Sequence, residues 1–256
     1  MRSYCGPSST ALSSVRCIRG VAGSPTAKCK TSWYIFVCCR NRHNDRVMSS
    51  VNRSSDCRAP SNPLIALAPH DALLLVDIQN DFLPGGSLET SDGDAIIPIL
   101  LDYVRLFQTH SLPIFLTRDW HPPDHCSFKP RGGPWPVHCV AGSPGSLPPP
   151  SFPTPISAVI IYKAIDRDQE AYSAFHHTAL DRHLRALTVH RLFIGGLATD
   201  YCVLNSVKDV RMRGYDVCLL MDGIKAVNLQ SDDGRHAEEE MVRLGAAPVR
   251  WEMLKI

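Results

Sequence analysis

Most of the chain alternates short apolar runs with segments of helical periodicity, and this order constrains the fold more than any other feature. The runs that predict strands are residues 72–76, 113–117, 159–162, 191–194 and 217–221, with 248–251 as a further edge strand. Helical spacing of apolar residues follows Asp94, which is placed to cap a helix reaching Gln108, and recurs around Leu184, Val207 and Met241. Fully apolar runs are typical of parallel strands covered on both faces. We therefore expect a three-layer α/β/α domain with a mostly parallel, Rossmann-like central sheet.

Four chemically reactive side chains follow these predicted strands. They are Asp77, Asp119, Lys163 and Cys202. Because the carboxyl ends of parallel strands meet at one edge of a sheet, where such folds bind ligands, we expect the four to converge. An ion pair with Lys163 would keep Asp77 ionised, so that this carboxylate can accept the thiol proton of Cys202 and deliver it to a leaving amine. The alternative is a surface ion pair with no part in catalysis.

Cys202 closes the segment Gly195–Cys202, which reads Gly-Gly-Leu-Ala-Thr-Asp-Tyr-Cys. An apolar run ends at the glycines and a helical pattern starts after Asp200, which predicts a strand, a tight turn and a helix. The thiol would then lie in the first helical turn, where free backbone N–H groups and the helix dipole lower a thiol pKa. The pattern favours a nucleophile, and the alternative is a small buried apolar residue.

A second polar group occupies the Pro- and Gly-rich loop after the second predicted strand. Asp119 and His121 are two residues apart and point to the same side of an extended backbone, and His138 lies at the far end of the loop. One carboxylate and two imidazoles with open positions suit a divalent metal, for which we expect Zn²⁺, with Fe²⁺ or Mn²⁺ as alternatives. His125 is a candidate fourth ligand.

The first sixty residues differ from the rest in charge. They carry ten Lys/Arg and two Asp/Glu, a net +8, so the whole-chain value of +2 leaves −6 for the remainder. They also hold six of the ten cysteines, without the paired spacing of a zinc site or a disulfide framework. We expect residues 1–62 to be a disordered extension or a targeting segment, and residues 63–256 to be the folded domain.

Several partners and locations are expected to be absent or secondary. The basic segment lacks interleaved aromatic residues or a recognisable module, so no nucleic-acid partner is expected. Its one apolar run, Trp33–Cys39, is too short to span a bilayer, and no membrane partner is expected. We expect a cytoplasmic protein that acts on a small molecule, with organelle import through residues 1–62 as the alternative. The sequence leaves a homo-oligomer open.

The motifs that carry these residues resemble the nicotinamidases (pyrazinamidases), a family of isochorismatase-like hydrolases. They are Asp77–Phe82, Pro84–Leu88, Thr117–His125, Gly133–Cys139, Tyr162-Lys163, Ala171–Phe175 and Gly196–Cys202. The motifs occur in the expected order, and the resemblance extends from about Leu64 to the end of the chain.

The resemblance implies a role for each matching residue. The catalytic triad would be Asp77, Lys163 and Cys202; the metal ligands Asp119, His121 and His138; and the ring-binding residues Phe82, Trp135 and Tyr172. A cis peptide between Leu197 and Ala198 would turn the N–H groups of Ala198 and Cys202 toward an oxyanion. The implied reaction, in NAD salvage, is hydrolysis of nicotinamide to nicotinate and ammonia through a cysteine thioester, with the metal anchoring the pyridine nitrogen.

Two positions depart from the family pattern, and two other functions stay open. Ala164 follows the lysine where many members have glycine, and Tyr201 precedes the cysteine where others have histidine, so substrate range could shift. Members also differ over whether the histidine matching His125 reaches the metal. One alternative is another amidase of the same superfamily that acts on a carbamoyl or ureido substrate. Such an enzyme would not need the loop that carries Asp119, His121 and His138. The other is a catalytically silent scaffold, although all three triad residues are present.

Overall fold

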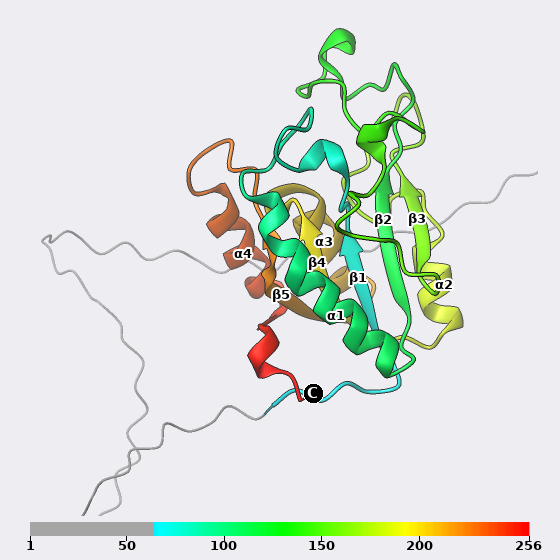
Figure 1. The fold of residues 1–256 in the computed structure, drawn as a ribbon, viewed down its shortest axis with the longest axis vertical. Coiled ribbons are helices and arrows are strands. Elements are labelled where there is room, and N and C mark those ends of the chain that lie inside the picture. The colour runs from blue at the N-terminus through cyan, green and yellow to red at the C-terminus, as the bar shows by residue number, and fades with distance from the viewer. Residues whose placement is uncertain (1–63, 256) are drawn as a thin grey trace, which may run out of the picture. The chain divides into compact units, whose positions relative to one another are not determined.

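The computed structural model describes residues 64–255; the expected extension, residues 1–62, lies outside this range. One parallel sheet has the order β3-β2-β1-β4-β5-β6 (Figure 1). Its strands are β1 Asp71–Val76, β2 Ile114–Asp119, β3 Val159–Lys163, β4 Arg191–Leu197, β5 Asp216–Lys225 and β6 Ala247–Val249. The helices are α1 Ile97–Thr109, α2 Leu180–Ala186, α3 Leu204–Met212 and α4 Asp233–Arg243. The predicted parallel α/β fold is confirmed, and the edge strand at the C-terminal end is β6.

The two faces of the sheet bury alternate residues of the same strands. Leu73 and Leu75 of β1 belong to the core beneath α1, whereas Leu74 and Val76 belong to the core beneath α2, α3 and α4. All six residues of β1 are buried, because a central strand covered on both sides has no solvent-facing side chains. This arrangement leaves the carboxyl ends of the strands as the edge at which polar groups can gather.

Strand β4 continues through the two glycines at which we predicted a turn. Gly196 has a φ of +119°, and a Cβ there would lie 2.1 Å from the carbonyl oxygen of Val76 in β1. Only glycine allows this approach, so the strand reaches Leu197 and the expectation of a tight turn at the glycines is wrong. A single π-helical turn, Thr199–Val203, then precedes α3.

The start of α1 also differs from the prediction. Asp94 lies in a 3₁₀ turn, Gly93–Ile96, and its side chain caps no helix; α1 begins at Ile97, with Pro98 in its first turn. Proline is well suited to that position because the first N–H groups of a helix have no partner within it. The turn displaces the helix cap by two residues, from Asp94 to Ile96.

Two residues that flank the site adopt left-handed backbone conformations. Asp77, directly after β1, has a φ of +50°, and Ala164, directly after β3, has a φ of +53°. This region favours glycine, which explains why glycine is suited to the position of Ala164, although alanine adopts the conformation here.

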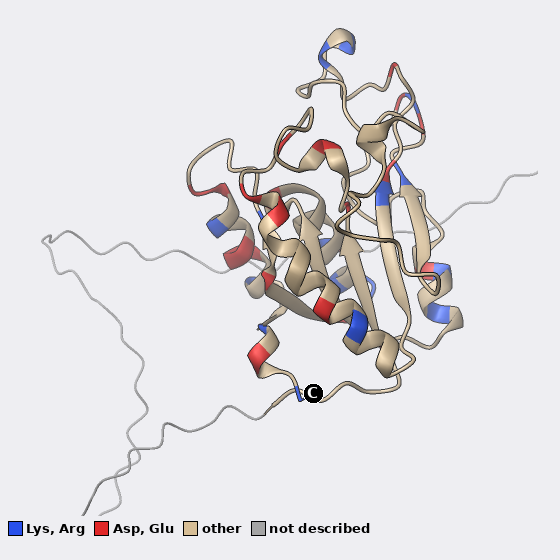
Figure 2. Cartoon of the chain, viewed as in Figure 1, with Lys and Arg blue, Asp and Glu red and all other residues tan. Residues whose placement is uncertain are grey.

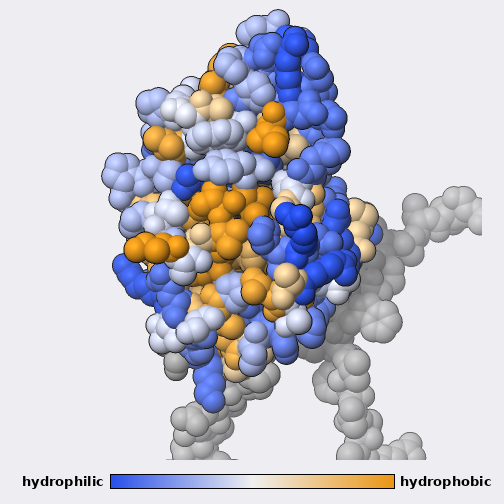
Figure 3. Space-filling view, turned by 90° about the vertical axis from the view of Figure 1, so that its right-hand side faces the viewer, coloured by the Kyte–Doolittle hydropathy of each residue, from blue (hydrophilic) through white to orange (hydrophobic). Residues whose placement is uncertain are grey.

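The surface is uneven in charge and in hydropathy. Figure 2 shows acidic residues on α4, in keeping with the net negative charge of the chain beyond its first sixty residues. Figure 3 shows an apolar area on the side of the molecule that carries β3 and α2. Tyr162 of the edge strand β3, and Ile156 and Ile165 beside it, are exposed. Among the described helices, none is both long and apolar enough to cross a membrane.

Candidate active site

The three residues predicted as a triad meet at the carboxyl edge of the sheet. Asp77 follows β1, Lys163 ends β3 and Cys202 follows β4, and all three are buried. The Nζ atom of Lys163 lies 3.0 Å from Oδ2 of Asp77 and 3.4 Å from Sγ of Cys202. The expected ion pair is therefore present beside the thiol, in the interior rather than at the surface.

Lys163 has a further partner that we did not predict for it. Its ammonium donates hydrogen bonds to Oδ1 of Asp119 and, at 3.2 Å, to the carbonyl oxygen of Ala171. Burial alone would lower the pKa of Lys163, but Asp119 and Asp77 outweigh it and hold the pKa well above its ordinary value. Lys163 is thus a permanent cation between two carboxylates.

Thr117 holds the carboxylate of Asp77 from the neighbouring strand. Its hydroxyl donates to Oδ1 of Asp77 at 2.5 Å and accepts from the backbone N–H of Asp77 at 3.2 Å. The other oxygen, Oδ2, lies near Lys163 but has no hydrogen bond directed at it, and a carboxylate oxygen of Asp77 lies within 4.8 Å of the Cys202 sulfur. Burial raises the pKa of Asp77 to about 6, against the opposing charge of Lys163. Asp77 can therefore exchange a proton near neutral pH.

The thiol of Cys202 has a higher pKa than the sequence led us to expect. Burial raises this pKa well above the ordinary value; Lys163 lowers it, and Asp77 and Asp119 raise it. The expectation of a thiolate stabilised by a helix N-terminus is wrong, because desolvation of the thiolate outweighs the favourable electrostatics. Cys202 is a thiol at rest and needs a base to become a nucleophile.

The predicted metal ligands form a compact, buried group. Asp119, His121 and His138 each offer a ligand atom, and these atoms lie within 4.8 Å of one another. Burial lowers the pKa of His121 to about 3, so its imidazole is neutral. Burial would raise the pKa of Asp119, but the positive charge of Lys163 holds it below its ordinary value, so the carboxylate is ionised. These are the protonation states in which both residues bind metal.

Backbone carbonyls set the orientation of both imidazoles. The Nδ1 atom of His121 lies 3.2 Å from the carbonyl oxygen of His138, and Nδ1 of His138 lies 2.8 Å from that of Pro136. A carbonyl can only accept, so each Nδ1 carries the proton and each Nε2 keeps a free lone pair. Because metal-bound histidines usually donate their second nitrogen in this way, the donor set fits a divalent metal.

His125 is engaged elsewhere. Its Nε2 donates to the carbonyl oxygen of Gln169 at 3.0 Å, and its Nδ1 lies 2.8 Å from the hydroxyl of Ser127, which can donate to it. It shares a cluster with His121 and Glu170 but is not part of the group around Asp119. Both of its nitrogens are thus occupied in this conformation.

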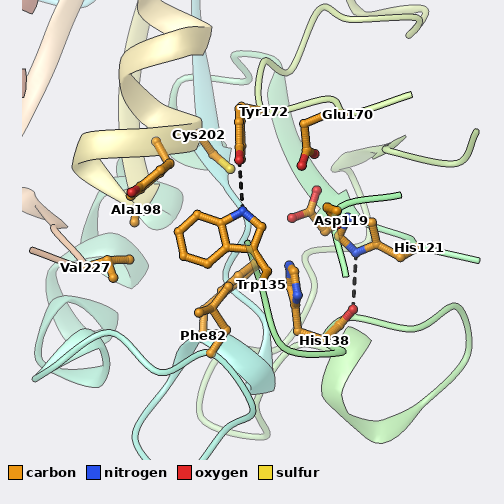
Figure 4. Close-up of a pocket in the computed structure, with 13 residues that line it drawn as sticks. Phe82, Asp119, His121, Trp135, His138, Glu170, Tyr172, Ala198, Cys202 and Val227 are labelled. Carbon is orange, nitrogen blue, oxygen red and sulfur yellow. Dashed lines mark hydrogen bonds between the residues drawn. The ribbon is translucent and has the colours of Figure 1, made fainter. Parts of the chain in front are cut away.

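The predicted ring-binding residues line one pocket with Cys202 and the metal group (Figure 4). The indole N–H of Trp135 donates to the hydroxyl of Tyr172 at 2.9 Å, and the ring of Tyr201 packs edge-on against Trp135 at 5.0 Å. Phe82 lies on the side of His138, with ring centroids 5.6 Å apart. The pocket thus combines aromatic walls with the thiol and the metal-ligand group, and Asp119 lies within 4.8 Å of the Cys202 sulfur.

Further pocket residues were missed by the sequence reasoning. They are Leu88, Ser127, Glu170 and Val227. Leu88 and Glu170 lie in or next to quoted motifs, but nothing in their spacing indicates that they face the cavity. Ala198 lines the pocket as well, and the peptide bond between Leu197 and Ala198 is cis, where the resemblance places one.

The side-chain amide of Gln79, three residues after the end of β1, supports Asp119. Its Nε2 donates to the carbonyl oxygens of Asp119 and Ser146, at 2.8 and 2.9 Å, and its Oε1 accepts from the N–H of Asp119 at 2.8 Å. Gln79 is fully buried and all three bonds go to backbone atoms. The amide thereby extends the pairing between the ends of β1 and β2 and fixes the backbone of Asp119.

Fold and site together define a Rossmann-like α/β protein with a buried thiol, carboxylate and lysine beside a carboxylate–imidazole group. The chain belongs to the isochorismatase family, whose domain model matches residues 71–253. It is 35% identical over 199 residues to the nicotinamidase of Escherichia coli, covering 70% of this chain and 93% of that protein.

Two solved structures share the fold. The pyrazinamidase of Pyrococcus horikoshii in complex with zinc has 44% identity and a TM-score of 0.69, and the match covers 72% of this chain and all of that one. PnC1 from L. infantum in complex with nicotinate has 32% identity and a TM-score of 0.68, over 75% of this chain and 98% of that one.

Proposed function

We propose that this protein is a nicotinamidase that hydrolyses nicotinamide to nicotinate and ammonia, as a step of NAD salvage. The observation that carries the proposal is that one pocket contains the thiol of Cys202, aromatic walls and a metal-binding group. The likeness to the E. coli nicotinamidase and to the nicotinate complex of PnC1 supports this substrate class. We place the reaction in the cytoplasm, with an organelle as the alternative site.

The first half of the reaction forms a thioester. Oδ2 of Asp77 accepts the thiol proton of Cys202, and the sulfur attacks the carboxamide carbon to form a C–S bond. The N–H groups of Ala198 and Cys202 stabilise the oxyanion. When the C–N bond breaks, the proton on Asp77 passes to the leaving nitrogen and ammonia departs. Lys163 stays protonated and balances the charge of Asp77.

The second half returns the enzyme to its starting state. Asp77, again a carboxylate, takes a proton from water, and the hydroxide attacks the thioester carbon. The C–S bond breaks, the thiolate of Cys202 recovers the proton from Asp77, and the carboxylic acid product leaves and ionises to nicotinate, its proton going to the released ammonia. Each proton that Asp77 accepts is thus returned, and the cycle needs no other co-reactant.

Asp119, His121 and His138 would hold the metal, which we propose to be zinc. The zinc complex of the P. horikoshii pyrazinamidase supports this choice, as does the mixed carboxylate and imidazole donor set. When bound, the ion supplies a Lewis acid that anchors the pyridine nitrogen. Phe82 and Trp135 would pack against the faces of the ring. The ring is thereby positioned with its carboxamide toward Cys202.

The direct test measures ammonia and nicotinate released from nicotinamide by the zinc-loaded full chain. Cys202→Ala should reduce turnover by more than about a thousandfold, because no other nucleophile replaces the thiol. Cys218→Ala is the matched control, since Cys218 is a buried cysteine of β5 away from the pocket, and it should retain activity. If Cys202→Ala kept activity within about tenfold of wild type, about 1.4 kcal/mol in barrier height, the thioester mechanism would be wrong. Turnover of a carbamoyl or ureido substrate in place of nicotinamide would favour the related amidase.

A further inference from the structure

We infer that Asp81 is a positioning residue that holds the metal-binding loop in its ligating conformation. The inference rests on the proposed metal site, and it concerns a residue that is not one of the proposed ligands. Asp81 follows β1 and immediately precedes Phe82, which lines the pocket. Its carboxylate reaches from this turn to the loop that carries His138.

The contact between the two segments is a hydrogen bond to an ionisable side chain. Oδ2 of Asp81 accepts the backbone N–H of Cys139 at 2.6 Å, and Oδ1 accepts that of Ser87 at 3.2 Å. Bonds from a backbone N–H to a carboxylate are stronger than bonds between neutral groups. Both carboxylate oxygens of Asp81 therefore bind backbone N–H groups. Oδ1 binds its own turn at Ser87, and Oδ2 binds the metal loop, which is the segment from His121 to Cys139.

Cys139 lies where the backbones of both histidine ligands meet. It directly follows His138, and its carbonyl oxygen accepts the N–H of His121 at 3.0 Å. It also has a φ of +45°, which is unfavourable for a residue other than glycine and persists only when the surroundings fix it. The bond from Asp81 supplies part of that support, so Asp81 acts on His121 and His138 through one peptide.

The carboxylate of Asp81 occupies space that is open only because residue 145 is a glycine. A Cβ on Gly145 would lie 2.0 Å from Oδ2 of Asp81 and 2.3 Å from its Cγ. Gly145 shows no positive φ, so its lack of a side chain is required by space rather than by backbone conformation. Gly145 belongs to the 3₁₀ turn Pro144–Ser146, which makes that turn the third segment fitted around Asp81.

The test compares three variants of the full chain in a zinc titration against a chromophoric chelator. In Asp81→Asn the amide oxygen can accept from only one of the two backbone N–H groups in the same way. We expect zinc affinity to fall about ten- to a hundredfold, the usual effect of losing a group that orients metal ligands. Gly145→Ala should have the same effect, because its methyl group displaces the carboxylate.

Glu89→Gln is the matched control. Glu89 is exposed in the same loop and accepts the N–H of Gly85 at 2.8 Å, but it makes no hydrogen bond or ion pair with the loop that carries His121 and His138. The zinc affinity of the Glu89→Gln protein should equal that of wild type. In both test variants, saturating zinc should restore nicotinamide turnover to within a fewfold of wild type, and the melting temperature of the metal-free protein should change little.

Three results would overturn the inference. The first is zinc affinity within twofold of wild type in both test variants. The second is a fall in metal-free melting temperature with activity that saturating zinc does not restore, because Asp81 would then be a structural residue only. The third is a wild-type chain that binds no zinc, which would remove the proposed metal site and this inference with it. Wild-type binding distinguishes the failure of the proposed site from that of the role of Asp81.

Discussion

Asp77 is set between opposing influences that decide when it can act as a base. Burial raises its pKa to about 6, and Lys163 and the hydroxyl of Thr117 counteract the rise. The base must be a carboxylate to accept the proton of Cys202. We therefore expect kcat/KM for nicotinamide to be constant above about pH 6 and to fall as the pH falls through that value. A pH–rate profile measures this directly, and an acidic limb near pH 4 would show that Asp77 is not perturbed in this way.

Thr117 offers a way to move that acidic limb. Thr117→Val keeps the shape but removes the 2.5 Å hydrogen bond that favours the ionised form of Asp77. The pKa of Asp77 should rise, so the acidic limb should move to higher pH, whereas Thr117→Ser should leave it in place. Profiles of the two variants measured at saturating zinc check this. If the acidic limb lay at the same pH in both variants, the hydroxyl of Thr117 would have no electrostatic role.

At the scale of elements, β1 and β2 are held together beyond their last paired residues by Gln79. In Gln79→Leu, the N–H and carbonyl of Asp119 and the carbonyl of Ser146 lose their partners in the interior. Each buried, unpaired group costs about 1–3 kcal/mol, and the losses are not additive. We expect the free energy of unfolding to fall by about 3 kcal/mol, measured by urea denaturation.

Asn80→Ala is the control for this change. Asn80 is the next residue, and its amide donates to the carbonyl of Pro144 at 2.8 Å in an exposed position, where water can replace it. Its effect should be below about 1 kcal/mol. Equal losses in the two variants would contradict the special role of Gln79.

At the scale of the whole molecule, the folded domain should be independent of the first sixty residues. Every strand, helix and pocket residue of the described structure lies beyond Ile65, and Ile65 itself pairs with the C-terminal segment at Leu254. A chain that begins at Pro60 should fold and hydrolyse nicotinamide at the rate of the full chain. Circular dichroism and the ammonia assay compare the two. If the shortened protein were insoluble or inactive, the first sixty residues would have to be part of the folded domain.

Removing the metal should affect binding more than the intrinsic reactivity of the thiol. Asp119 lies within 4.8 Å of the Cys202 sulfur, but the thiol is not one of the proposed ligands, so chelation should weaken nicotinamide affinity while a small alkylating reagent still modifies Cys202 (Figure 4). Affinity, alkylation rate and melting temperature should be measured on the same chelated and zinc-reloaded samples. Unchanged affinity would contradict the anchoring role, and a large fall in melting temperature would indicate a structural metal.

The sequence alone was sufficient for the fold class and for the edge at which the site lies. Apolar runs such as 72–76 reveal a parallel strand because both of its faces must be buried, and a residue such as Asp77 is placed by the end of its strand. The group of Asp119, His121 and His138 was also predictable, since its members are characteristic ligands in a short loop. Their roles remain predictions, while their proximity is observed.

Only the tertiary structure decided the features that depend on segments distant in the chain. Gly196 lies within β4, packed against Val76, and does not form a turn. The hydrogen bond between Thr117 and Asp77 joins residues that are forty positions apart in the sequence. Local sequence also misjudged the pKa of Cys202, because a helix N-terminus is a local feature whereas burial is a property of the whole fold. Periodicity reports which residues face the core, but it carries no information about which polar groups meet there.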